Sequence, residues 1–557
     1  MKNRSLSIFA SMLVSLGVLL LIVLTSQAAS KPVVGQQDIF PQGTSLMPPV
    51  PQTSLISRAA NGDGGDAPSV DPAVSANGRY IAYSSRSQNI VISDTHPFTE
   101  DIFIYDRLYN LTKQLTPYPG TQANNDSLDP DISGDGQVVV FASYADNWEW
   151  SVDFNGEKDV YVYTYYDAPE EITAGQGAGY GYAVLVSYTT EDGYYAANDA
   201  SYEPAISLNG RYVAFTSVAT NLIANDTNNV SDIYVRDLHT GQIERVSIAS
   251  NGAQGFGPSY QPDISADGRF VVFTSSAPNL VPNDTNNAPD TFLHDRETGL
   301  TRRVSVNSSG GQGMPTGTAG GLAQNPSLSA NGQFIVFEST FTNLSLTPDS
   351  NGAQDIFLHN ALSGETRLIS RAEDGSQANN GSDLPVISPD AHYVAYRAFA
   401  NNLVYTDTNG IPDIFVVDLV QQTVSRQSVA SDGAQSHGPN GVTTADISAD
   451  GGLIAFDSDA WDLVPDDSNG SLPDIFLRDR DLPEVSYRYT AQEIDPADFP
   501  ITDTVAAHAA AQWYKIRVDD PGSTLTATLY NLSGDYNLYL FAPSIDEETG
   551  QIRDLGQ

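Results

Sequence analysis

The chain has 557 residues, with 68 acidic residues against 26 basic ones and no cysteine. Its formal net charge of -42 excludes a nucleic-acid-binding protein in practice, because such a surface repels phosphate backbones. The absence of cysteine excludes thiol catalysis and thiolate metal sites.

The N-terminus carries an export pattern. Two basic residues precede a long apolar run that ends near Leu24, and small residues follow it. This pattern predicts a signal peptide over residues 1–30 with cleavage near Ala28. The run is also long enough for an uncleaved N-terminal anchor, which would be the only membrane contact. The proline-rich residues 31–52 are predicted to form a linker.

One sequence unit recurs seven times along residues 53–481. A representative copy reads Pro-Asp-Ile-Ser-Ala-Asp-Gly-Arg-Phe-Val-Val-Phe over residues 262–273, and successive copies lie 58 to 74 residues apart. Each unit reads as four short strands joined by tight turns. Because units of this length are too long for one coil of a solenoid, the repeat predicts an all-β, seven-bladed propeller.

The two ends of the repeat array complement each other. The seventh unit has no fourth strand after Asp479, whereas residues 53–59 match residues 366–372, the fourth strand of the fifth unit. We therefore predict that the N-terminal segment pairs with the strand at 474–479. Such pairing closes the ring and removes the exposed sheet edges of an open array.

An acidic pattern, Asp-x-Asn-x-x-x-Asp, lies between the second and third strands of most units. Short oxygen-bearing side chains at this spacing can surround a hard cation, so the pattern predicts calcium sites. The same residue types also make side-chain turns with the backbone, so the pattern can instead only shape the loop. The candidate metal ligands are Asp153, Asn155, Asp159, Asp226, Asn228, Asp232, Asp284, Asn286, Asp290, Asp349, Asn351, Asp355, Asp407, Asn409, Asp413, Asp467, Asn469 and Asp474.

The second unit is interrupted by an insertion rich in aromatic residues. Loops that break a repeat are common positions for ligand sites, and exposed aromatic rings suit glycan or peptide ligands. The alternative is that these rings pack the insertion onto the propeller. The candidate ligand-binding residues are Trp148, Trp150, Tyr180, Tyr182, Tyr194 and Tyr195.

Catalytic motifs are missing from the sequence. It contains no Gly-x-Ser-x-Gly, His-Glu-x-x-His or P-loop pattern, and its seven histidines share no spacing typical of metal ligands. The chain is therefore expected to be non-catalytic.

The C-terminal part follows a different pattern. Residues 482–505 are predicted to be a linker, and residues 506–557 contain three alternating segments typical of strands, at 512–518, 523–529 and 535–541. The last segment resembles a strand of bacterial pre-peptidase C-terminal domains, which are small β-sandwiches attached to exported enzymes. This part is therefore predicted to be an incomplete β-sandwich-like domain.

The repeat itself resembles the WD40-like repeats of secreted TolB-like bacterial β-propellers. Together with the N-terminal export pattern, the resemblance implies a protein that is secreted or at the cell surface of a bacterium, and we expect it to be a monomer. The expected function is a calcium-stabilised scaffold that binds a protein or glycan partner. The alternative is an accessory region of a larger exported hydrolase or peptidase.

Overall fold

The computed structural model describes residues 51–480, except for gaps at 60–61, 92–98, 119–120, 150–152, 166–180, 190–193, 316–320, 347–348, 350 and 466. Pro51–Arg480 form one compact unit. Elsewhere the described residues are short strands. These are β1 (Phe9–Ser11), β2 (Val18–Ile22), β33 (Gln492–Ile494), β34 (Ile501–Val505), β35 (Tyr514–Ile516), β36 (Tyr539–Phe541), β37 (Pro543–Ile545) and β38 (Ile552–Leu555). Within the described parts of the chain, no helix is long and apolar enough to cross a membrane.

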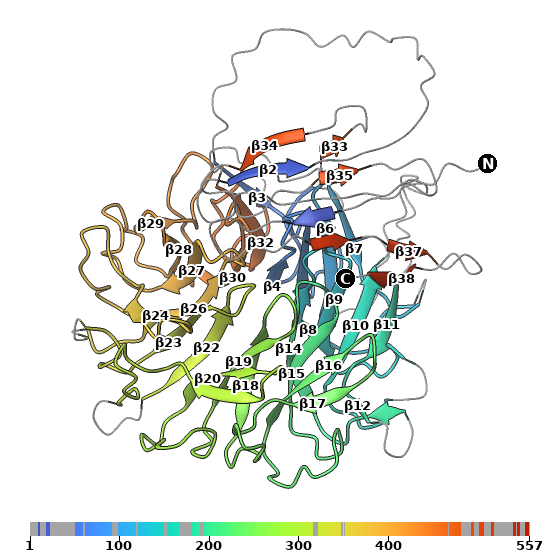
Figure 1. Ribbon diagram of the computed structural model, residues 1–557. Helices are drawn as coiled ribbons and strands as arrows, with labels where there is room; N and C mark the ends of the chain where they lie inside the picture. Colours follow the sequence, from blue (N-terminus) through green and yellow to red (C-terminus); the bar gives the residue numbers. More distant parts are fainter. Residues whose placement is uncertain are drawn as a thin grey trace. The chain divides into compact units, whose positions relative to one another are not determined.

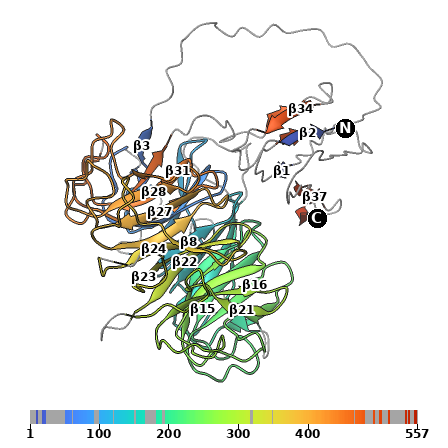
Figure 2. The ribbon, with the colours of Figure 1, turned by 60° about the vertical axis from the view of Figure 1, so that its left-hand side comes forward.

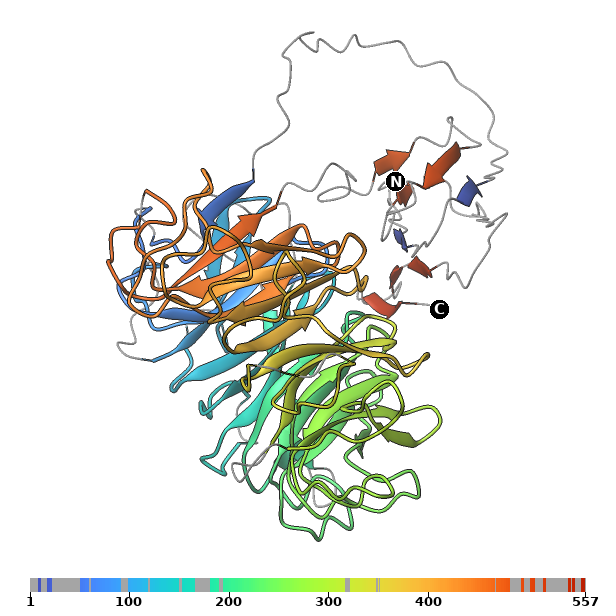
Figure 3. The same ribbon diagram turned by 90° about the vertical axis from the view of Figure 1, so that its left-hand side faces the viewer.

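The compact unit is a seven-bladed β-propeller, as predicted. Each blade is a four-stranded sheet with antiparallel strand pairs, and the sequence runs around the ring from blue through green to orange (Figures 1, 2 and 3).

The blades have the following strands. Blade 1 is β4 (Ser69–Val74), β5 (Tyr80–Ser85), β6 (Asp101–Asp106) and β7 (Leu111–Gln114); blade 2 is β8 (Ser127–Ile132), β9 (Val138–Ser143), β10 (Asp159–Tyr165) and β11 (Gly181–Leu185). Blade 3 is β14 (Ser201–Ile206), β15 (Tyr212–Ser217), β16 (Asp232–Asp237) and β17 (Ile243–Arg245); blade 4 is β18 (Ser259–Ile264), β19 (Phe270–Ser275), β20 (Asp290–Asp295) and β21 (Leu300–Arg303). Blade 5 is β22 (Ala323–Leu328), β23 (Phe334–Ser339), β24 (Asp355–Asn360) and β25 (Thr366–Leu368); blade 6 is β26 (Ser382–Ile387), β27 (Tyr393–Ala398), β28 (Asp413–Asp418) and β29 (Thr423–Arg426). Blade 7 is β30 (Val442–Ile447), β31 (Leu453–Ser458), β32 (Asp474–Asp479) and β3 (Gln52–Leu55), and a two-stranded sheet of β12 (Tyr188–Thr189) and β13 (Tyr195–Ala196) follows blade 2.

The predicted closure of the ring is confirmed. Strand β3 pairs antiparallel with β32, with Leu55 opposite Phe476, so the first strand of the propeller completes the last blade (Figure 1). The Ser57 hydroxyl adds a 2.6 Å hydrogen bond to Asp474 Oδ1. Neither edge of the array therefore stays unpaired.

The second strand of each blade is buried on both faces, because each blade lies between two others. In β19, Val271 and Phe273 belong to a core cluster shared with blade 3. Val272, on the opposite face of the same strand, belongs to a cluster shared with blade 5. Alternate side chains thus join successive blades, which explains why these strands read as continuous apolar runs.

Carboxylates on three innermost strands connect one blade to the next. Asp131, Asp263 and Asp446 each accept a hydrogen bond of 2.6 to 2.9 Å from a backbone amide of the following blade, at Ile206, Leu328 and Val74 respectively. Burial raises the pKa of Asp131 to about 7 and those of Asp263 and Asp446 to about 6. Repulsion between these carboxylates adds to the rise.

These raised pKa values predict that the protein is more stable at mildly acidic than at mildly alkaline pH. Between about pH 4 and pH 7 the folded state binds more protons than the unfolded state, so the free energy of unfolding falls as pH rises. We expect a higher melting temperature at pH 5 than at pH 8, and a weaker pH dependence in Asp446→Asn. A wild-type melting temperature that is flat or rises across this range would contradict the assignment.

The predicted C-terminal segments are described only in part. Strands β35 and β36 fall within the predicted segments 512–518 and 535–541, and each pairs with β1. The predicted segment 523–529 lies outside the described residues. So do most residues of the predicted signal and most residues of each predicted linker.

Candidate functional site

The Asp-x-Asn-x-x-x-Asp motifs lie on one face of the propeller. In a four-stranded meander, the connection between the second and third strands and the connection to the next blade are at the same end of the sheet. We call the surface formed by these connections the loop face. Its second-to-third strand connections are residues 86–100, 144–158, 218–231, 276–289, 340–354, 399–412 and 459–473.

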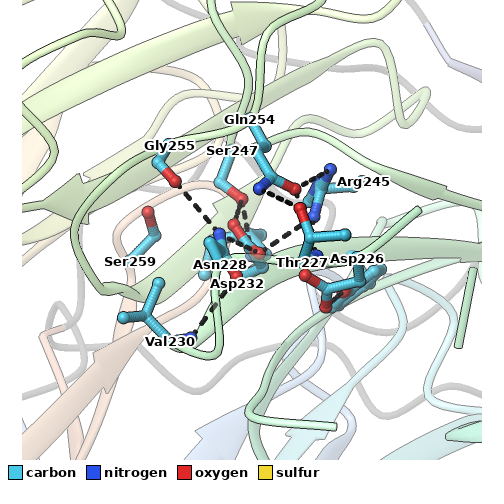
Figure 4. Close-up of polar contacts among 12 residues, drawn as sticks. Asp226, Thr227, Asn228, Val230, Asp232, Arg245, Ser247, Gln254, Gly255 and Ser259 are labelled. Carbon is cyan, nitrogen blue, oxygen red and sulfur yellow. Dashed lines mark hydrogen bonds and ion pairs between the residues drawn. The ribbon is translucent and has the colours of Figure 1, made fainter. Parts of the chain in front are cut away.

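Within each motif, the asparagine side chain holds the loop against its own blade and against the connection to the next blade. In blade 3, Asn228 Nδ2 donates to Asp232 Oδ2 at 2.8 Å and to the Gly255 carbonyl at 3.0 Å (Figure 4). Asn228 Oδ1 accepts from the Val230 amide at 3.3 Å. The amide oxygen therefore serves the turn, as the second interpretation of the motif predicted.

An arginine whose side chain is 9% exposed lies between the two carboxylates of this motif. Arg245 NH1 is 3.1 Å from Asp226 Oδ1 and 3.1 Å from Asp232 Oδ2 (Figure 4). The remaining oxygen of each carboxylate is also bonded, because Tyr234 donates its hydroxyl to Asp226 Oδ2 and Ser247 donates to Asp232 Oδ1. In blade 3 the guanidinium thus occupies the position at which a cation would neutralise the pair.

Blades 4 and 6 repeat this arrangement. Arg303 lies 3.0 Å from Asp284 and 3.2 Å from Asp290. Arg426 lies 3.2 Å from Asp407 and 3.4 Å from Asp413. Asn286 and Asn409 keep the same hydrogen bonds to the last aspartate.

Blade 5 uses a neutral donor. Leu368 stands at the arginine position, since it lies opposite Phe357 in the strand register just as Arg245 lies opposite Tyr234. Gln377 Nε2 donates to Asp349 Oδ1 at 2.7 Å and to Asp355 Oδ2 at 2.6 Å. The amide thus bridges the two carboxylates, but it brings no positive charge.

Blades 2 and 7 have no donor at either position. The arginine position is Leu185 in blade 2 and Leu55 in blade 7. The glutamine position, just before the carbonyl that accepts from the motif asparagine, is Ala196 and Gly64. In both blades the motif asparagine still donates to the last aspartate, from Asn155 Nδ2 to Asp159 Oδ2 and from Asn469 Nδ2 to Asp474 Oδ2.

The pKa values of the last aspartates reflect whether an arginine is present at the pair. Burial, followed by repulsion from Asp153, raises the pKa of Asp159 to about 7 despite a hydrogen bond from Ser187. Burial also raises the pKa of Asp232, but there the positive charge of Arg245 lowers it in part. Among the described residues, no three or more Asp, Glu or His side chains come together as a ready metal site.

The neutralising residues were not predicted, although the sequence contains a signal for them. The arginine follows the last aspartate of the motif by 13 positions, and the serine follows it by 15, in each of blades 3, 4 and 6. An offset that recurs in a repeat protein marks side chains that meet in every unit.

The aromatic residues predicted to bind a ligand in blade 2 fall into three groups. Trp148 is buried with 1% exposure and packs 4.7 Å from the Phe141 ring, so its role is in the core and not on a ligand surface. Tyr194 packs against the same cluster and donates its hydroxyl to Glu149 at 2.9 Å. Tyr182 and Tyr195 are exposed, whereas Trp150 and Tyr180 lie outside the described residues.

Comparisons with known proteins return only distant structural likenesses. No protein-family model and no curated protein matches the sequence. A putative TolB from Agrobacterium tumefaciens is 17% identical with a TM-score of 0.31, and the match covers 54% of this chain and 80% of that one. TolB from Acinetobacter baumannii is 14% identical with a TM-score of 0.32, covering 65% and 64%. A prolyl endopeptidase is 10% identical with a TM-score of 0.41, covering 72% and 46%. The chain's own strand pairing, rather than these likenesses, establishes the seven-bladed propeller.

Proposed function

We propose that the chain is an exported, non-catalytic β-propeller scaffold that binds a basic protein segment on its loop face. The observation that carries the proposal is a set of large, exposed apolar side chains on this face. They are Tyr118, Tyr144, Phe154, Phe256, Met314, Leu346, Phe399, Tyr405 and Trp461. Aromatic side chains and methionine are enriched at protein interfaces, where they supply most of the binding energy.

The charge of the loop face indicates the charge of its partner. The second-to-third strand connections contain fourteen acidic residues, against Arg86 and Lys158 as the only lysine or arginine within them. Three of these acids, Asp226, Asp284 and Asp407, are paired with arginines of the fourth strands, so acidic residues still predominate. A predominantly acidic surface attracts a positively charged partner and speeds its association. A basic segment with apolar side chains would satisfy both features of this face.

A protein partner fits the spacing of the exposed side chains better than a glycan does. Phe154 lies in blade 2, Phe256 between blades 3 and 4, Tyr405 in blade 6 and Trp461 in blade 7. Side chains so far apart in the ring suit an extended surface, whereas a glycan site gathers its aromatic rings in one concave place.

Two further parts of the proposal rest on the sequence pattern. Export rests on the N-terminal basic and apolar segments. Calcium stabilisation rests on the acidic motifs, and the arginines of blades 3, 4 and 6 reduce the number of motifs that need a cation. The alternative of an accessory region in a larger exported hydrolase stays a prediction.

The test is selection of peptides from a random peptide library on the immobilised chain. We expect enrichment of sequences rich in lysine, arginine and aromatic residues. The triple variant Phe399→Ser, Tyr405→Ser and Trp461→Ser should weaken their binding at least tenfold. The matched control changes Leu300, Leu362 and Val420 to serine. These three side chains are exposed to a similar extent on the opposite face, so the control should bind as the wild type does.

Two outcomes would overturn the proposal. One is enrichment of acidic peptides or of none. The other is binding to an array of neutral glycans with no binding to basic peptides.

A further inference from the structure

Blade 2 contains a buried carboxylate oxygen without a partner. Asp153 is 4% exposed, and its Oδ1 atom has no hydrogen-bond partner. Its Oδ2 atom accepts a 2.6 Å hydrogen bond from the Tyr161 hydroxyl, so the side chain is held in place. A buried carboxylate oxygen without a partner is costly, and it calls for an explanation such as an ion or a water at that position.

The other blades show what that group is. In blade 3 the corresponding tyrosine, Tyr234, holds Asp226 Oδ2 in the same way, and Asp226 Oδ1 faces the Arg245 guanidinium. Asp153 Oδ1 therefore corresponds to the oxygen that contacts a positive charge in blades 3, 4 and 6. In blade 2 the residues at the two donor positions, Leu185 and Ala196, have no side-chain donor.

None of the described residues around this pair supplies a substitute cation. The charged groups that act on Asp153, Asp159 and Tyr161 are all acidic, and apart from these residues themselves they are Asp146, Glu149 and Glu157. Asn155 and Ser187 donate hydrogen bonds to Asp159, but both are neutral. As far as the described residues go, the pair therefore combines two buried carboxylates with no positive charge.

We propose that blade 2 binds a calcium ion between Asp153 Oδ1 and Asp159 Oδ2, in the place that an arginine fills in blades 3, 4 and 6. Carboxylate oxygens are the ligands that calcium prefers, and backbone carbonyls and water can complete its coordination. Magnesium suits the position less, because it needs a stricter octahedron. Blade 7 also lacks both donors, but its Asp467 is only half-buried and has no buried oxygen without a hydrogen-bond partner, unlike Asp153.

This inference deepens the proposed calcium stabilisation, and it does not depend on partner binding. The experiment is calorimetric titration of the chelator-treated, full-length chain with calcium chloride. We expect a site with a dissociation constant of about 0.1 to 1 mM, the range of extracellular calcium modules. Asp153→Asn should lose this site, whereas the matched variant Asp226→Asn in blade 3 should keep it.

A second variant keeps the test informative if Asp153→Asn folds poorly. Leu185→Arg supplies the missing guanidinium, so it should abolish calcium binding in blade 2. It should also raise the melting temperature measured without calcium to the value that the wild type reaches with calcium. Three results would overturn the proposal: no calcium binding in the wild type, equal binding in wild type and Asp153→Asn, or equal stabilisation by magnesium at the same ionic strength.

Discussion

Removal of residues 51–59 is expected to unfold blade 7 and make the protein aggregate. Leu55 and Ile56 are buried with 3% and 2% exposure, and burial of each such side chain contributes about 1.5 to 3 kcal/mol. Loss of the ladder to β32 removes several hydrogen bonds worth about 0.5 to 1.5 kcal/mol each. The total is comparable with the whole stability of a typical domain, about 5 to 15 kcal/mol.

The measurement is thermal unfolding combined with size-exclusion chromatography. The shortened chain should lose its cooperative transition and elute as aggregates, because the edge of β32 becomes available to other chains. Removal of residues 31–50 is the matched control and should change neither property. A chain without residues 51–59 that stays monomeric and keeps the wild-type melting temperature would show that the ring does not need this strand.

Replacement of the blade 3 arginine is expected to have the second largest effect. The double variant Arg245→Leu/Gln254→Ala leaves Asp226 and Asp232 buried without a neutralising group. Breaking a buried ion pair in this way costs about 3 to 5 kcal/mol. We expect that loss in the free energy of unfolding, measured with urea at pH 8 without calcium.

The single variant Arg245→Leu should cost less, about 1 to 2 kcal/mol in line with a partly replaced hydrogen bond. Gln254 stands where Gln377 bridges the carboxylates of blade 5, so its amide can take over from the arginine. The control is Arg211→Leu, which breaks the ion pair with Asp237 near the surface and should cost under about 1 kcal/mol. Equal losses in the control and in the double variant would contradict this account.

Because the chain is a repeat, its fold could be predicted from the sequence. Seven copies of one unit, and the likeness of residues 53–59 to a fourth strand, were enough to predict both the number of blades and the closure by β3. The roles of individual side chains were harder to predict. The motif around Asp226 looked the same as that around Asp153, because what separates them lies on another strand, at Arg245 and Leu185.

Burial was the second property that the sequence pattern did not show. Trp148 was a candidate ligand-binding residue, with packing onto the propeller as the alternative, and its ring lies in the core beside Phe141. Conversely, Phe399 and Tyr405 lie in one loop of ordinary length, residues 399–412, and are exposed. Only the packing of neighbouring blades decides which aromatic side chain of a loop stays exposed.

The most direct test of this account is the number of calcium ions bound per chain in three proteins. Blade 2 differs from blade 3 at the two donor positions. Removal of the donors from blade 3 should therefore create there a calcium site like the one that we propose for blade 2. Relative to the wild type, Asp153→Asn should bind one calcium ion fewer, and Arg245→Leu/Gln254→Ala should bind one more. The same number of bound calcium ions in all three proteins would contradict the claim that a bound cation neutralises the carboxylate pair of blade 2 and that Arg245 neutralises the pair of blade 3.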